Sequence, residues 1–154
     1  MGKSQSESHD RRLLLVVDDF QDGREMLSEY LRFHGFDVTE AVDGAAAVEI
    51  AQAIQPRVVL MDLTMPGTDG WEATRRLKAD SRTRDIIVIA VTANALQGDE
   101  ERARAAGCDG YIAKPFDLYT LAERLREVLK RGPSALAATS EPAKRIQPPD
   151  QKSV

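Results

Sequence analysis

Five polar side chains follow apolar runs that are typical of buried strands, and their types suit phosphate and metal chemistry. Asp18 and Asp19 come directly after "LLLVV", Asp62 follows "RVVLM", Thr92 follows "IIVIAV" and Lys114 follows "GYIA". In open parallel α/β sheets the carboxyl ends of the strands meet at one edge and form the binding site. We therefore expect three carboxylates, a hydroxyl and an ammonium group to converge in one cleft.

Three acids in one cleft repel each other and lose hydration unless a cation is present. Their hard oxygen ligands suit Mg²⁺, which prefers one or two carboxylates together with phosphate oxygens. Asp62 is then placed to attack a phosphoryl group and form an aspartyl-phosphate. Because such a transition state carries negative charge on the phosphoryl oxygens, Lys114 would stabilise it, and Thr92 would hydrogen-bond one of these oxygens.

Each of these residues also has an ordinary structural explanation. An aspartate that ends a strand is more often a helix N-cap or a turn former. A single threonine at this place is more often structural, and a single lysine is nearly always a solvated charge. The joint placement on four strands of one sheet favours a functional site.

Short apolar runs alternate with helical patterns along the chain, as in a doubly wound α/β fold. Five strand–helix repeats with short connections predict a five-stranded parallel sheet, of flavodoxin-like type, with helices on both faces. Strands are expected at 13–18, 36–41, 57–63, 85–93 and 110–114, and helices at 20–34, 44–54, 70–80, 96–107 and 116–132.

The composition indicates a soluble, cytoplasmic protein with one domain. The formal net charge is −4 at pH 7 and 30% of the residues are charged, so no general attraction to nucleic acid or to an anionic membrane is expected. No apolar run approaches the roughly 20 residues of a membrane span. A single cysteine, Cys108, excludes an intrachain disulfide and is expected to pack as a small apolar side chain.

Three segments are predicted. Residues 1–11 form a polar, flexible arm, residues 12–131 form the α/β domain, and residues 132–154 form a disordered tail. The tail begins at Gly132, has four of the seven prolines of the chain and shows no helical or strand period. It is too short for a separate output domain.

Four motifs, in order and at the expected strand ends, resemble the receiver domain of bacterial two-component response regulators over roughly residues 12–131. They are the acidic pair in "VVDDF", the acceptor segment "LMDLTMPGTDG", the threonine in "IAVTANA" and the lysine in "GYIAKPF". The stretch "VTANALQGDEERARAAGCDGYIAKPF" is similar to stand-alone receivers of cell-cycle and developmental phosphorelays, and to receivers carried on hybrid histidine kinases.

The resemblance assigns a role to each matching residue. Asp62 corresponds to the acceptor aspartate, Asp19 to the direct metal ligand, and Asp18 to the acid that holds the metal mostly through water. The Thr64 backbone carbonyl would complete the protein ligands of Mg²⁺. Thr92 and Lys114 correspond to the phosphate-binding pair, Tyr111 to the aromatic switch residue, and Pro115 to a proline that follows a cis peptide bond.

The resemblance also implies a function and partners. A phosphohistidine on a histidine kinase or histidine phosphotransferase would donate the phosphoryl group, and this partner would dock near Phe20, the first helix (20–34) and the Pro115-Phe116 loop. Phosphorylation would change the face formed by residues 96–132 and let it bind a downstream protein, as a monomer or as a phosphorylation-dependent dimer. The protein would catalyse its own phosphotransfer and slow dephosphorylation, without other small-molecule turnover. Thr64 and Asn94 occupy positions that tune the lifetime of the phosphate.

Three other functions compete with this interpretation. A receiver-like docking module that is never phosphorylated would normally lack an acid, the acceptor or the lysine, and this chain has all of them. A haloacid-dehalogenase-like phosphatase would place its nucleophile on the first core strand, with a second acid where Thr64 stands. A flavodoxin-like cofactor carrier would need a phosphate-binding loop after the first strand, where "DDFQD" would repel phosphate.

Overall fold

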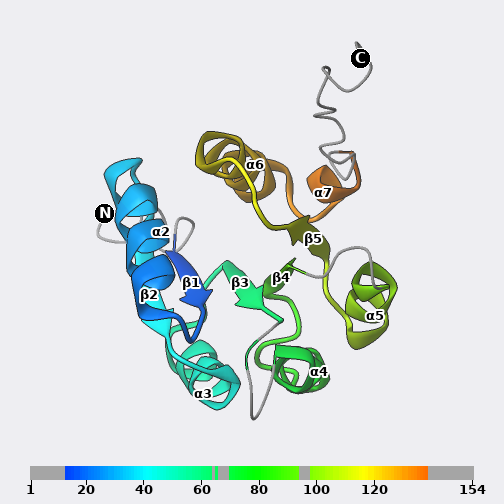
Figure 1. Ribbon diagram of the computed structural model, residues 1–154. Helices are drawn as coiled ribbons and strands as arrows, with labels where there is room; N and C mark the ends of the chain where they lie inside the picture. The colour runs from blue at the N-terminus through cyan, green and yellow to red at the C-terminus, as the bar shows by residue number, and fades with distance from the viewer. Residues whose placement is uncertain (1–12, 64, 66–69, 94–97, 139–154) are drawn as a thin grey trace, which may run out of the picture.

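The computed structural model describes residues 13–63, 65, 70–93 and 98–138, which form five strands and six helices (Figure 1). The strands are β1 (Leu13–Val17), β2 (Asp37–Ala41), β3 (Val58–Asp62), β4 (Ile87–Thr92) and β5 (Gly110–Ala113). The helices are α2 (Gln21–Phe33), α3 (Gly44–Ile54), α4 (Gly70–Ala79), α5 (Asp99–Ala106), α6 (Leu118–Arg131) and α7 (Ser134–Ala138). No helix in these ranges is both long enough and apolar enough to cross a membrane.

The five strands form one parallel sheet in the order β2-β1-β3-β4-β5, which confirms the predicted fold class. Strand order reverses between β1 and β3, because β2 lies on one side of β1 and the later strands lie on the other. The register pairs Val17 with Met61 and Asp62 with Val91, so neighbouring strands end at the same edge. This edge is where an open α/β sheet forms its site.

Apolar side chains cover both faces of the sheet, since the strands β3 and β4 are buried at every position. Figure 1 shows α3, α4 and α5 on one face and α2, α6 and α7 on the other. One layer of the core includes Val59, Met61 and Leu77, and the other includes Leu60, Leu31 and Leu125. Successive strand residues alternate between the two layers, as the period of a strand requires.

An ion pair joins α4 to the sheet at the end opposite the acids. The Lys78 ammonium donates to the carbonyl oxygens of Arg84 and Ile86 and to the Asp109 carboxylate at 2.8 Å. The same Asp109 oxygen accepts a hydrogen bond from the Val88 amide. These contacts fix the starts of β4 and β5 relative to α4. They therefore help to align the carboxyl ends of the two strands with each other.

The prediction that residues 132–154 lack regular structure is wrong for Ser134–Ala138, which form the short helix α7. Ala135 and Leu136 are buried and join the core layer under α6. Leu136 lies over Gly110 of the edge strand, where an added Cβ would come within 2.9 Å of a Leu136 methyl group. Burial of this leucine thus stabilises the helix. Residues 139–154 of the predicted tail and the predicted arm at 1–11 lie outside the described residues.

Replacement of Leu136 by alanine is expected to lower the free energy of unfolding by about 2–3 kcal/mol. The change removes buried methyl groups and leaves a cavity over Gly110, which has no side chain to fill it. Urea denaturation of both proteins measures the change. Ser134→Ala, at an exposed position of the same helix, is the control and should change stability by less than about 0.5 kcal/mol. Equal stability of the Leu136 variant and the wild type would show that α7 does not contribute to the fold.

Cys108 packs between α5 and β5, and burial is the main cause that raises the pKa of its thiol to about 11. Only the thiolate reacts with alkylating agents. At pH 8 we expect iodoacetamide to modify the folded protein more slowly than the urea-unfolded chain, by on the order of a hundredfold. Mass spectrometry of timed samples measures both rates, and similar rates would contradict this burial.

Candidate functional site

The structure places the predicted polar residues at one edge of the sheet. Asp62 and Thr92 are the last residues of β3 and β4, Asp18 and Asp19 follow β1, and Lys114 follows β5. The backbone amide of Lys114 donates to the Thr92 carbonyl at 2.8 Å, which extends the pairing of β4 and β5 by one residue. Residues from four strands therefore meet at one edge, as their spacing in the sequence predicts.

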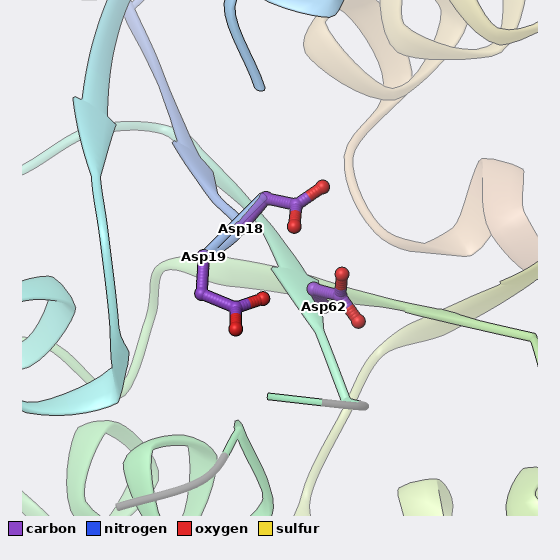
Figure 2. A group of neighbouring side chains, drawn as sticks. All are labelled: Asp18, Asp19 and Asp62. Carbon is purple, nitrogen blue, oxygen red and sulfur yellow. The ribbon is translucent and has the colours of Figure 1, made fainter. Parts of the chain in front are cut away.

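Three carboxylates gather at this edge, and Figure 2 shows them side by side. One oxygen each from Asp18, Asp19 and Asp62 lies within 4.8 Å of the other two. Asp62 is the most enclosed, with 3% of its surface exposed, whereas Asp18 is half-buried and Asp19 is exposed. The arrangement combines one buried, one half-buried and one exposed carboxylate.

The side chain of Lys114 contacts the cluster directly. The Lys114 ammonium lies 3.1 Å from Oδ2 of Asp62, and the lysine side chain is 35% exposed. Lys114 offsets one of the three formal negative charges, which leaves an excess of two among these four described residues. A small divalent cation with oxygen ligands matches this excess, and a donor set made only of carboxylate oxygens suits Mg²⁺.

Burial and a neighbouring like charge both affect the pKa of Asp18. Burial raises the pKa of Asp18 above its ordinary value of 3.8, and the nearby charge of Asp62 raises it further. The Phe20 amide, which donates to Oδ1 of Asp18 at 3.0 Å, and the charge of Lys114 lower the same pKa. The upward causes prevail, so the ionised form of Asp18 is less stable in the fold than in water.

The remaining predicted residues surround this edge. Thr92 is fully buried, and Tyr111 of β5 packs against the core layer under α3, α4 and α5. The Lys114–Pro115 peptide bond is cis, as the resemblance implies. Thr64 and Asn94 lie outside the described residues, so the predicted Thr64 carbonyl ligand stays a prediction. Phe20, expected near the donor protein, is 63% exposed.

Gly70, the first residue of α4, is a site residue that the sequence analysis missed. A Cβ at this position would lie 2.6 Å from the Asp62 carbonyl oxygen and 3.0 Å from side-chain atoms of Met61 and Leu63. Glycine therefore lets α4 begin directly against the end of β3. From the sequence, Gly70 is only the start of the predicted helix 70–80, because the close approach to Asp62 depends on tertiary packing.

The chain is similar to known proteins over the described domain. A sequence model of the response regulator receiver domain matches residues 14–126. The polar-differentiation response regulator DivK of Brucella anthropi is 34% identical over 116 residues, which are 75% of this chain and 94% of DivK. The DNA-binding dual master transcriptional regulator RpaA of Synechocystis is 36% identical over 118 residues, 77% of this chain, and the match spans only 49% of RpaA.

Solved structures show the same similarity. The receiver domain of the sensor histidine kinase PA1611 of Pseudomonas aeruginosa, with a magnesium ion coordinated in its active-site cleft, is 37% identical with a TM-score of 0.72. That match covers 77% of this chain and 98% of the other. The chemotaxis protein CheY4 of Vibrio cholerae is 29% identical with a TM-score of 0.71, over 75% of this chain and 97% of the other.

Replacement of Asp18 by asparagine is expected to raise the unfolding temperature in EDTA at pH 7, by about 2–4 °C. The pKa of Asp18 in the folded protein lies above its ordinary value of 3.8. At pH 7 the ionised carboxylate therefore lowers the stability of the fold, and the neutral asparagine removes this cost. The amide oxygen still accepts from Phe20. Glu29→Gln, the same charge change on the exposed face of α2, is the control. An unfolding temperature for Asp18→Asn at or below the wild-type value would contradict repulsion in the cluster.

Proposed function

Since the chain belongs to the response regulator receiver family of two-component signalling, we propose that it accepts a phosphoryl group on Asp62 with Mg²⁺ as cofactor. The observation that carries the proposal is the geometry around Asp62. This buried carboxylate lies 3.1 Å from the Lys114 ammonium. One of its oxygens also lies within 4.8 Å of an oxygen of Asp18 and of an oxygen of Asp19. A buried nucleophile, a cation and a place for a metal are what phosphoryl transfer requires.

In the proposed reaction an oxygen of Asp62 attacks phosphorus, and the phosphorus–nitrogen bond of a phosphohistidine breaks. The departing imidazole nitrogen keeps the bonding electron pair, so atoms and charge balance. Lys114 stabilises the negative charge on the phosphoryl oxygens, and the Thr92 hydroxyl donates a hydrogen bond to one of them. A magnesium ion held by Asp18, Asp19 and Asp62 supplies further positive charge when it is bound.

The response to phosphorylation in this proposal is a shift between two conformations. The phosphoryl group gives Thr92 a new hydrogen-bond acceptor, and a movement of Thr92 opens space for Tyr111 to turn inward. The face formed by α5, β5 and α6 then changes shape and binds a downstream protein, with or without dimerisation. An unchanged Tyr111 rotamer in a complex with a phosphate mimic would contradict this switch.

The donor is proposed to be a phosphohistidine on a histidine kinase or a histidine phosphotransferase, in the cytoplasm. Phe20 precedes the first residue of α2 and Tyr119 lies in the first turn of α6, and both are exposed and offer apolar contacts to such a partner. The chain itself performs one phosphotransfer and slow self-dephosphorylation, and acts as a signalling protein with no separate substrate.

Intact-mass spectrometry after incubation with acetyl phosphate and Mg²⁺ tests the phosphoacceptor directly. Wild-type protein is expected to gain about 80 Da, the mass of one phosphoryl group, and Asp62→Asn is expected to gain none. Because the metal neutralises the acids, EDTA should abolish the gain in the wild type.

Asp37→Asn, which removes an acid outside the cluster on β2, is the matched control and should be phosphorylated like the wild type. A folded wild-type protein that gains no mass with Mg²⁺ would instead favour the docking module that works without phosphorylation. A gain that persists in Asp62→Asn would place the acceptor elsewhere.

A further inference from the structure

Arg24, in the first turns of α2, reaches back toward the acidic turn at the end of β1. Its side chain is only 12% exposed. One guanidinium nitrogen, Nη1, donates to the carbonyl oxygen of Asp18 at 3.0 Å, and Nε donates to Oε1 of Glu40 at 2.9 Å. The guanidinium therefore joins β2 to the peptide that links the two acids.

The Asp18 carbonyl is a sensitive point for the geometry of the cluster. It belongs to the peptide unit between Asp18 and Asp19, so its orientation sets ψ of the first acid and φ of the second. The direction in which both carboxylates leave the backbone depends on these two angles. On the other side of the turn, the Phe20 amide donates to the Asp18 carboxylate. Arg24 thus restrains the backbone carbonyl of Asp18, and the Phe20 amide restrains its side chain.

Glu40 on β2 keeps the guanidinium in place. It accepts from Arg24 at 2.9 Å and also, at 3.4 Å, from Nη2 of Arg32, which lies about two turns further along α2. Arg32 is 46% exposed and donates to the Val38 carbonyl at 3.0 Å. The two arginines share one carboxylate, and only Arg24 contacts Asp18. The planar fork of arginine, with donors in fixed directions, suits the double contact.

We infer that Arg24 is a positioning residue for the metal site, which presets the peptide between Asp18 and Asp19 so that both carboxylates face the cation. The inference rests on the metal-assisted function proposed above. Arg24 contacts the Asp18 carbonyl rather than its carboxylate, and so acts through the backbone of the acidic turn. Groups that orient ligands in this way contribute strongly to metal affinity.

Calorimetric titration of the full chain with Mg²⁺ tests the inference in wild type, Arg24→Met and Arg32→Met. Methionine keeps an apolar stem of similar length and removes all donors. We expect Arg24→Met to weaken Mg²⁺ binding about tenfold or more. Arg32→Met, which removes the same charge and another contact to Glu40, should stay within about twofold of the wild type because this side chain is largely exposed. Unfolding temperatures in EDTA measure the structural effect of each change separately.

The outcomes separate this inference from the proposed function. Wild-type protein that binds no Mg²⁺ would overturn the proposed function and the inference with it. Wild-type binding with equal affinities for Arg24→Met and Arg32→Met would overturn the inference alone. If Arg24→Met does not fold, Arg24→Lys replaces it, since lysine keeps the charge but reaches one acceptor at a time. This variant should also bind more weakly than wild type, and wild-type affinity would contradict the positioning role.

Discussion

The repulsion among three carboxylates at one edge of the sheet is the constraint on which the rest of the site depends. Oxygens of Asp18, Asp19 and Asp62 lie within 4.8 Å of each other, and the 3.1 Å contact with Lys114 offsets one of the three charges. The raised pKa of Asp18 reports the cost of burial and of the neighbouring charge. Such a cluster persists because the surrounding fold holds the acids together, and a cation or a phosphoryl group changes its energy strongly.

The scaffold meets this constraint with rigid, buried elements. β3 and β4 are buried along their whole length and bring Asp62 and Thr92 to the same edge. Gly70 lets α4 start against the Asp62 carbonyl, and Arg24 holds the carbonyl of Asp18. Asp18 and Asp62 are thus each held at the backbone carbonyl, and their carboxylates also contact the Phe20 amide and the Lys114 ammonium, respectively. These contacts explain how the fold keeps charged groups together at one edge.

The sequence predicts most of the fold because each central strand is an apolar run that ends in a polar residue. The same runs predict the positions of Asp62, Thr92 and Lys114, since the carboxyl ends of parallel strands share an edge. Long-range packing is what the sequence did not reveal. The helix α7 depends on Leu136 filling the space over Gly110, and Arg24 resembles any solvated helix charge until Glu40 and the Asp18 carbonyl are placed beside it. Gly70 was missed for the same reason.

The central claim is that this charged edge is built for a divalent cation, and the unfolding temperature of the wild type with and without Mg²⁺ tests it most directly. Binding to the folded state alone raises stability by an amount that grows with the ratio of free ligand to its dissociation constant. At fixed ionic strength we predict a saturable rise in unfolding temperature with Mg²⁺, and a smaller rise in Asp62→Asn. An unfolding temperature that is the same in Mg²⁺ and in EDTA would contradict the account.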